Sequence, residues 1–276
     1  MALMGTLRSI ARPAVRSLRR AYQASGGRFH CNACRRTFRS FRPLRERERF
    51  PLSASLRMIG GGGVVHCVCP FCESTDRDRH LLMYIERLHL FERMDRPRVL
   101  HFAPEPCLAA KIAETNPAEY IQADFHPRSA EVRKIDITSI PFEDDRFDLV
   151  AVNHVLEHVP DDAKALSEVY RALKPGGVAI LQTPYSALLH NTFSDPGIAS
   201  EEERLHLYGQ EDHVRIYGQD LFARIEGVGF ALRREKHSEL LPDVDVRRHC
   251  VNPEEDLILA VKPMPVDAEV PAGCTA

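Results

Sequence analysis

The sequence is short of several residue types. It contains no tryptophan, only six lysines among 37 basic residues, and no acidic residue before Glu46. No apolar run approaches the roughly 18 residues of a membrane-spanning helix, and arginines interrupt every N-terminal stretch that could form the apolar core of a secretory signal. These absences argue against a membrane-spanning or secreted protein. We therefore expect a cytoplasmic protein whose eight cysteines stay reduced, as metal ligands or buried residues.

The composition is that of a globular protein with an uneven distribution of charge. The 276 residues are 44% apolar and 28% charged, which suits one large domain and one small domain. The net charge of −2 conceals a division: residues 1–45 hold eleven arginines and no acid, whereas the remainder has 26 basic and 39 acidic residues, a charge of −13. We predict that residues 1–28 form a basic, flexible arm. A transit peptide and a surface that contacts RNA or a membrane are the alternatives.

Four of the cysteines form two Cys-x-x-Cys pairs, Cys31 with Cys34 and Cys69 with Cys72, with 34 residues between the pairs. Zinc prefers four tetrahedral ligands, and each pair offers two thiolates from one tight turn. Because all four positions would be filled by protein, such a site would be structural. We predict a zinc-ribbon-like module over residues 29–75. The alternatives are a redox-active pair without metal, or a ligand set in which one of these replaces a thiolate: Cys67, His30 or His66.

After a connecting helix over residues 76–95, runs typical of buried strands alternate with helical patterns. This alternation is typical of a parallel sheet covered on both faces. We therefore predict an α/β fold: a Rossmann-like, mostly parallel sheet with helices on both faces, plus the small N-terminal zinc-binding module. The expected strands are 98–103, 119–124, 132–137, 147–154 and 178–182, the helices are 107–114 and 161–173, and an antiparallel pair of strands follows at 230–236 and 256–262.

Ligands bind such sheets beyond the carboxyl ends of the strands, near the point where the strand order reverses. Asp124 ends the second expected strand, about 20 residues beyond the first loop, where one carboxylate can accept hydrogen bonds from both hydroxyls of a ribose. A surface acid at a strand end is also common without any ligand. The same rule selects the loop after Ala103 and two further segments, Asp136-Ile137 and Asn153-His154.

A longer pattern narrows the function. The run DIT-x-IPF-x-DD-x-FDLV-x-x-NHVLEHVPD, followed by A-L-x-E-V-Y-R-A-L-K-P-G-G, resembles the core of class I S-adenosylmethionine-dependent methyltransferases, closest to the methyltransferase type 11 group, over residues 96–265. The resemblance implies a seven-stranded Rossmann-like sheet that binds S-adenosyl-L-methionine. It also implies that Asp124 holds the ribose, that Asp136 and Ile137 border the adenine, and that Asn153 and His154 lie beside the methionine part.

The first loop departs from that family. Where the family usually has D-x-G-x-G-x-G, this chain has His101-Phe-Ala-Pro-Glu-Pro-Cys107, with no glycine and with two prolines that offer no N–H. S-adenosyl-L-methionine has no phosphate, however, and its carboxylate can use the N-terminus of the following helix. The loop is similar to that of a zinc-ribbon-bearing branch of these methyltransferases. We therefore expect Ala103, Pro104 and Glu105 to contact the cofactor.

A long segment, residues 186–216, separates the fifth strand from the next helix. Insertions of this length are commonly lids or binding loops, so we expect it to select the methyl acceptor. Methyl transfer depends mainly on alignment, with a base where the acceptor is a hydroxyl or a carbon acid. The candidate catalytic residues are His154, at the mouth of the fourth strand, and His213, with Asp212 as its orienting carboxylate. His158 is a third candidate, and a purely structural role is the alternative for each histidine.

We predict an S-adenosyl-L-methionine-dependent methyltransferase with residues 96–265 as its catalytic domain and residues 266–276 as a flexible tail. The acidic body favours a small-molecule or sugar-like methyl acceptor, since it would repel a long polyanion. One alternative is an rRNA or tRNA methyltransferase that binds RNA through the zinc module and the arginines of residues 1–50. Another is a non-catalytic binding module, which the glycine-free loop favours.

Overall fold

The computed structural model describes residues 21–44, 55–60 and 66–265. Its centre is a seven-stranded sheet with the strand order β10-β11-β8-β7-β4-β5-β6. The strands from β8 to β6 in this order are parallel, and β11 is antiparallel to both of its neighbours. The expected Rossmann-like, mostly parallel sheet and its late antiparallel pair are thus confirmed. The strands are β4 (Arg98–Phe102), β5 (Glu119–Asp124), β6 (Arg133–Lys134), β7 (Phe147–Val152), β8 (Leu173–Ile180), β10 (Ala231–Glu235) and β11 (Leu257–Val261).

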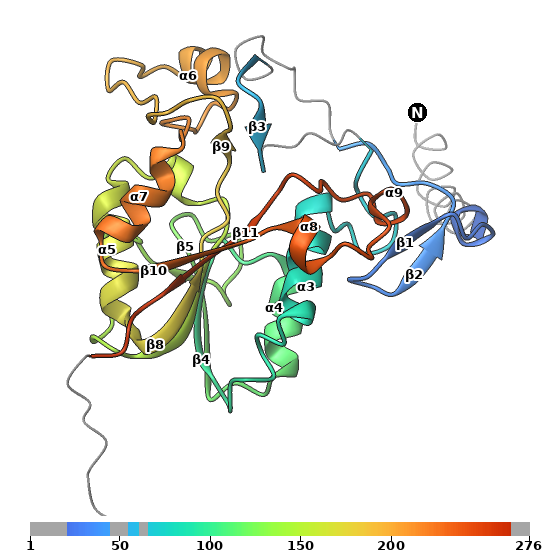
Figure 1. The fold of residues 1–276 in the computed structure, drawn as a ribbon, viewed down its shortest axis with the longest axis horizontal. Helices are drawn as coiled ribbons and strands as arrows, with labels where there is room; N and C mark the ends of the chain where they lie inside the picture. The colour runs from blue at the N-terminus through green and yellow to red at the C-terminus, as the bar shows by residue number, and fades with distance from the viewer. Residues whose placement is uncertain (1–20, 45–54, 61–65, 266–276) are drawn as a thin grey trace, which may run out of the picture.

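Helices cover both faces of the sheet (Figure 1), because successive side chains of a buried strand point to opposite faces and here both faces are apolar. In β4, Val99 packs in the apolar cluster that includes α3 and α4, whereas its neighbour Leu100 packs in the cluster that includes α5 and α7. The segment expected as a connecting helix therefore forms part of the layer on one face. The helices are α3 (Asp76–Arg87), α4 (Pro106–Glu114), α5 (Asp162–Ala172) and α7 (Asp220–Gly227).

Two strands differ in length from the expectation. The third strand was expected over residues 132–137, but β6 has only two residues. The chain leaves the sheet at Asp136, whose carboxylate accepts a hydrogen bond from the backbone N–H of Thr138 at 2.8 Å and so forms a local turn. The fifth strand is longer than expected, because β8 begins at Leu173 directly after α5 and includes the Lys174-Pro-Gly-Gly segment. A register shift between Phe147 and Leu149 of β7 accommodates this start.

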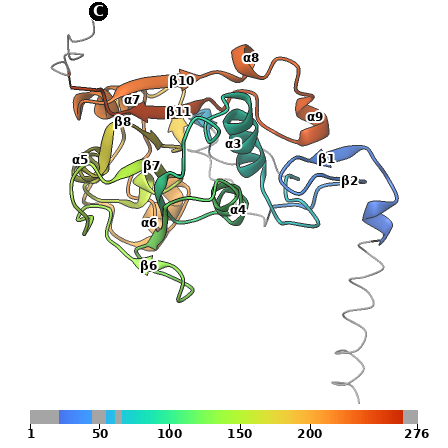
Figure 2. The same cartoon turned by 90° about the horizontal axis from the view of Figure 1, so that it is seen from below.

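The two cysteine pairs lie in a small unit, here called the cysteine module (residues 29–44 and 66–75). Arg79 of α3 joins this module to the body. Its buried guanidinium donates hydrogen bonds of 2.8–3.0 Å to the carbonyls of Ser74, His249 and Cys250, and lies 4.2 Å from the ring centroid of Phe41. The cysteine module is therefore packed against the domain that contains the sheet. Figure 2 shows its antiparallel hairpin of β1 (Phe29–Cys31) and β2 (Arg36–Phe38) beside α9 (Val246–His249).

The long segment, called the insertion below (residues 186–216), folds back on itself beyond the end of β8. A bridge joins Phe193 to Ile216 near its two ends. At Gly218, a Cβ atom would lie 2.6 Å from the carbonyl carbon of Asn191, so this close approach of two backbones requires glycine. Figure 1 shows α6 and β3 at this end of the molecule. The elements here are β3 (Met58–Ile59), which pairs with β9 (Tyr185–Ser186), and α6 (Glu201–Tyr208).

Some expectations concern residues outside the described part of the chain. They include most of the arm at residues 1–28, the arginine-rich stretch at 45–54 and the tail at 266–276. Within the three described ranges, no helix combines the length and the apolarity that crossing a membrane requires.

Candidate active site

Two non-glycine residues at the ends of neighbouring strands adopt a left-handed backbone. Ala103 follows β4 with φ 46°, and His154 follows β7 with φ 53°. Such φ values are uncommon for residues with a side chain. The turns are held by hydrogen bonds from the N–H of Ala103 to the carbonyl of Ala123 at 2.8 Å and from the N–H of His154 to the carbonyl of Gln182 at 2.6 Å. Because the strand order reverses between β4 and β7, the two turns flank the crevice in which ligands of such sheets bind.

A cavity of about 210 Å³, called the strand-end cavity, opens between these turns. Four of the residues expected to bind cofactor line it: Ala103, Glu105, Asn153 and His154. A larger hollow of about 510 Å³ lies between α5 and α7, but none of the expected site residues lines it. The geometry thus brings the ends of the first and fourth expected strands together. The remaining lining residues of the strand-end cavity are Arg77, Asp78, Leu81, Gln182 and Glu255.

Asn153 is the most informative residue of the strand-end cavity. It is 3% exposed, yet among the described residues neither the nitrogen nor the oxygen of its side-chain amide has a hydrogen-bond partner. The hydroxyl of Thr183, just after β8, is also buried without a partner. Leaving such groups unpaired costs about 1–3 kcal/mol each, so native proteins rarely do so without a ligand or water to bind. The residues present therefore fit a polar ligand that both donates and accepts hydrogen bonds.

The charges around the cavity come partly from segments that the sequence pattern did not single out. Nη1 of Arg77, in the first turn of α3, lies 3.0 Å from Nδ1 of His154 and donates a 3.3 Å hydrogen bond to the carbonyl of Gly60. Burial lowers the pKa of His154, and the charge of Arg77 lowers it further, whereas Glu157 opposes the shift. His154 is therefore a neutral imidazole at pH 7, which is the form a base requires.

Glu255 lies across the cavity, in the turn before β11. It is 5% exposed, and burial raises the pKa of its carboxyl to about 7, against the charge of Arg77. Neither Arg77 nor Glu255 was expected in the site, because they come from segments on either side of the family-like pattern. A basic residue in the first turn of a helix, directly after the second cysteine pair, was the one available signal, and by itself it indicates only a solvated residue.

The first loop has no glycine, and hydrogen bonds between side chains stabilise its turn. His101 is fully buried at the end of β4, with Nε2 2.8 Å from a carboxylate oxygen of Glu105 and Nδ1 3.0 Å from the hydroxyl of Tyr120. Helix α4 then begins at Pro106, and its N-terminus has no side-chain cap. Since the first N–H groups of a helix lack internal partners, this end remains available to an anionic group. Pro104, expected beside the cofactor, lies in this loop but does not line the cavity.

The residues expected at the nucleoside lie on the next strands and outside the cavity lining. Asp124 ends β5, and its carboxylate accepts a 2.7 Å hydrogen bond from the N–H of His126. Asp136 is exposed and forms the turn with Thr138 described above, whereas Ile137 is buried. Because β5 lies beside β4, Asp124 shares the carboxyl edge with the cavity, and this position stays compatible with its expected role.

The expected pair of His213 and Asp212 lies next to His158 and Glu157 rather than in the cavity. Oδ2 of Asp212 lies 3.3 Å from Nδ1 of His158, and the charge of Asp212 also acts on His213, the histidine that it was expected to orient, by opposing the fall in its pKa. Burial lowers the pKa of His213 to about 4, although Glu157 opposes the shift. Burial also raises the pKa of Glu157, but the hydrogen bond to His154 and the nearby histidines more than offset it and leave the pKa below its usual value.

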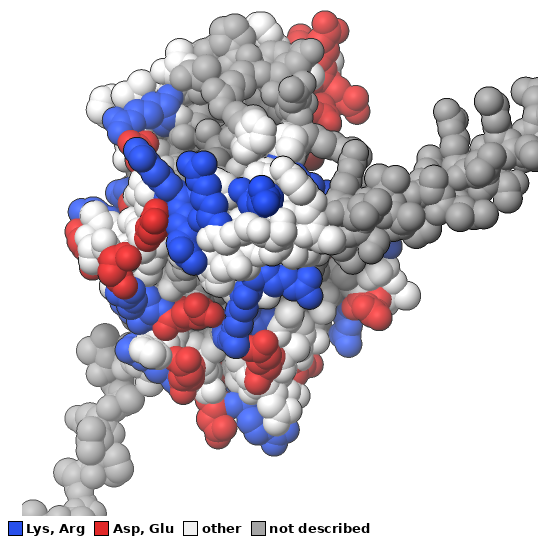
Figure 3. Space-filling model, turned by 90° about the vertical axis from the view of Figure 1, so that its right-hand side faces the viewer, with Lys and Arg blue, Asp and Glu red and all other residues white. Residues whose placement is uncertain are grey.

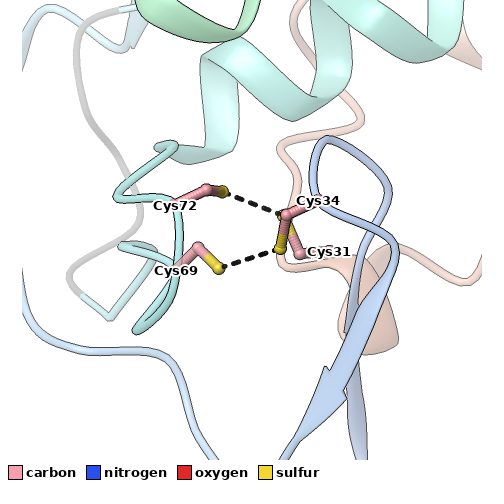
Figure 4. A group of neighbouring side chains, drawn as sticks. All are labelled: Cys31, Cys34, Cys69 and Cys72. Carbon is pink, nitrogen blue, oxygen red and sulfur yellow. Dashed lines mark hydrogen bonds between the residues drawn. The ribbon is translucent and has the colours of Figure 1, made fainter.

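The four cysteines of the two pairs converge (Figure 4). Their Sγ atoms all lie within 4.8 Å of one another, with 3.6 Å between Cys31 and Cys72 and 3.8 Å between Cys34 and Cys69. Zinc–sulfur bonds of 2.3 Å in a tetrahedron place sulfurs about 3.8 Å apart. The sulfurs are too far apart for a disulfide, and the donor set fits one zinc ion. Cys67, His30 and His66 do not belong to the cluster.

On the face that carries the cysteine module, groups of basic side chains are separated by acidic ones (Figure 3). Two arginines of the module have partners within the protein: Arg42 pairs with Glu73, and Arg36 stacks on the ring of Phe71. Most of the remaining arginines of residues 1–50 lie outside the described residues. The described face therefore adds no support for an RNA-binding surface.

Part of the sheet matches a known protein family. Residues 101–181 match a family described as a methyltransferase domain, a stretch that begins in β4 and ends just after β8. Together, the sheet order, the strand-end cavity and this match support a class I S-adenosylmethionine-dependent methyltransferase.

The individual similarities are short or distant. The demethylmenaquinone methyltransferase of Streptomyces avermitilis is 48% identical over 46 residues, which are 17% of this chain and 20% of that protein. The one of Clavibacter sepedonicus is 30% identical over 97 residues and matched over 40% of its length. The chain thus spans much less than two thirds of these relatives. Among solved structures, the YcgJ protein from Bacillus subtilis has a TM-score of 0.46 at 18% identity. The alignment covers 67% of this chain and 100% of the YcgJ chain.

Proposed function

We propose that the protein is an S-adenosyl-L-methionine-dependent methyltransferase that acts on a small-molecule or sugar-like acceptor. The observation that carries the proposal is the amide of Asn153, buried without partners in the cavity at the reversal point of the sheet. The family match over residues 101–181 supports the same activity. The glycine-free loop does not contradict it, because His101 and Glu105 shape the turn that glycines provide elsewhere.

The charges of the cavity suit the methionine part of the cofactor. Arg77 and the uncapped N-terminus of α4 would hold its carboxylate, and Glu105 or Glu255 its amino group. Asn153 and Thr183 would supply the remaining hydrogen bonds. Asp124 would hold the ribose, with Asp136 and Ile137 bordering the adenine. When bound, the cofactor would supply an electrophilic methyl group. Nδ1 of His154 accepts a hydrogen bond from Arg77, so this nitrogen would take the proton of the methyl acceptor once Arg77 turns to the carboxylate of the cofactor.

A small acceptor is favoured by the charge and the size of the site. The body of the chain carries a net charge of −13, which opposes a polyanionic substrate. The strand-end cavity, of about 210 Å³, is of a size for a compact group. The short stretches that match proteins named demethylmenaquinone methyltransferases also favour a small-molecule acceptor.

We further propose that the cysteine module holds one structural zinc ion. Cys31, Cys34, Cys69 and Cys72 would supply all four ligands, so no position stays open for a substrate. Zinc would then fix the module against α9 and against α3, which borders the cavity through Arg77.

The test is calorimetric titration of the zinc-loaded protein with S-adenosyl-L-methionine and with S-adenosylhomocysteine. We expect one site per chain for each. Absence of binding to both, in folded protein, would falsify the proposal. Binding without transfer to any of a panel of hydroxylated small molecules would instead favour the non-catalytic binding module.

A further inference from the structure

A second cluster of metal-ligating side chains lies beside the strand-end cavity. Glu157 and His158 belong to the short helix η1 (Leu156–His158) after β7, and His213 comes from the insertion. One carboxylate oxygen and one ring nitrogen from each histidine all lie within 4.8 Å of one another. The fold thus brings His213 to His158, which is 55 positions earlier in the chain. No local sequence pattern indicates this contact.

Two of these ligand atoms are buried and have no partner. Within the part of the chain that the structure describes, Oε2 of Glu157, which is 2% exposed, makes no hydrogen bond, and Nε2 of His213, which is 6% exposed, makes none. The other oxygen of Glu157 lies 3.5 Å from His154. A carboxylate oxygen and an imidazole nitrogen buried without partners in one such group are suited to binding a cation, which would satisfy both.

We infer that Glu157, His158 and His213 bind a divalent transition-metal ion, with zinc as the metal to test. Two imidazole nitrogens and one carboxylate oxygen form a common ligand set for zinc and its neighbours, and they leave a position open for water. Asp212, 3.3 Å from Nδ1 of His158, would orient that ring from outside the site. His158 is partly exposed, which gives an ion a path from solvent.

Such an ion would tie the insertion to the end of β7. The two segments already share a 3.0 Å hydrogen bond from the N–H of Val214 to the carbonyl of Glu157. A metal bond from His213 would add a second tie and restrict opening of the insertion over the cavity. This inference does not depend on methyl transfer, because the ligands and their unpaired atoms are independent of the cofactor.

Zinc content after dialysis separates this site from the cysteine module. We expect two zinc ions per chain in the unaltered protein, and one in His213→Gln and in Glu157→Gln. Cys31→Ser should lose the other ion. His190→Gln, a change of an exposed histidine in the insertion, should keep both. One zinc in the unaltered protein with none in Cys31→Ser would overturn the inference, as would two zinc ions in both His213→Gln and Glu157→Gln.

A second measurement covers variants that fold poorly. After a chelator has removed bound metal from Cys31→Ser protein and from unaltered protein, added zinc should raise the melting temperature and slow proteolysis of the insertion, and more chelator should reverse both effects. If zinc leaves the cleavage rate of the insertion unchanged in the unaltered protein, the tie proposed here does not exist.

Discussion

The guanidinium of Arg77 lies 3.0 Å from Nδ1 of His154 and so joins the first turn of α3 to the end of β7. This contact connects the helix that follows the cysteine module with the residue proposed to accept a proton. It also means that a change in the position of α3 alters the charge beside His154.

Replacing Arg77 by Met should weaken cofactor binding at least tenfold, because a charged hydrogen bond contributes about 1.5–3 kcal/mol. The pKa of His154 should rise, since the charge of Arg77 lowers it. The acid limb of the kcat/KM profile should therefore move to higher pH. Arg87→Met, on the same helix but paired with Asp243, is the control. An unchanged pH profile with normal folding would argue against His154 as the base.

Replacing Asn153 by Leu should separate binding from stability. The amide has no partner in the protein, so its loss should leave the free energy of unfolding unchanged or higher. Binding of S-adenosylhomocysteine should weaken at least tenfold, as followed by calorimetry. Urea unfolding gives the stability. Normal binding of S-adenosylhomocysteine would show that the amide does not contact the cofactor. A loss of several kcal/mol in the free energy of unfolding would show that the amide has a structural partner.

Glu255 should make the protein less stable as the pH rises. Its folded pKa of about 7 exceeds the reference value of 4.5, so the folded state binds more protons between these values. Stability should therefore fall from pH 4.5 to 7, by on the order of 3 kcal/mol, and this contribution should stay constant above pH 7. Glu255→Gln should remove that slope. Urea unfolding at several pH values measures it, and an identical slope in the variant would contradict the assignment.

Arg79 should be essential to the attachment of the cysteine module. Arg79→Met leaves the carbonyls of His249 and Cys250 without their donor, at about 1–3 kcal/mol each, while that of Ser74 keeps the N–H of Cys69. We expect a loss of about 3 kcal/mol or more in urea unfolding. Arg36→Met is the control, because that side chain stacks on Phe71 and should cost no more than about 1 kcal/mol. Equal losses in the two variants would mean that the buried hydrogen bonds of Arg79 carry no special weight.

Much of the sheet was predictable because buried parallel strands have continuous apolar runs. Strands at 98–103, 119–124 and 147–154 agree closely with β4, β5 and β7. The third strand was overestimated, because the turn that Asp136 forms with Thr138 ends the pairing and apolar content alone does not reveal it. The start of β8 was missed for the opposite reason: a Pro-Gly-Gly segment indicates a loop unless its partner strand can shift register.

The site was predictable only where it follows strand ends. Ala103, Glu105, Asn153 and His154 were placed by the rule for ligand positions in such sheets, and they line one cavity. Arg77, Glu255 and Thr183 were not identified, because their positions depend on how α3 and the turn before β11 pack. The contact of Asp212 with His158 was not expected for the same kind of reason, since adjacency in sequence does not decide which histidine a carboxylate meets.

Periodicity and spacing are local properties of a chain, and they predicted the α/β alternation, the two cysteine pairs and the strand ends that carry the candidate ligands. Which charged groups lie in contact depends on the tertiary packing. It brought Arg77 to His154, four thiols to one point, and His213 to Glu157. These contacts join segments far apart in the chain, and their distances follow from packing of the whole core, which no local pattern encodes.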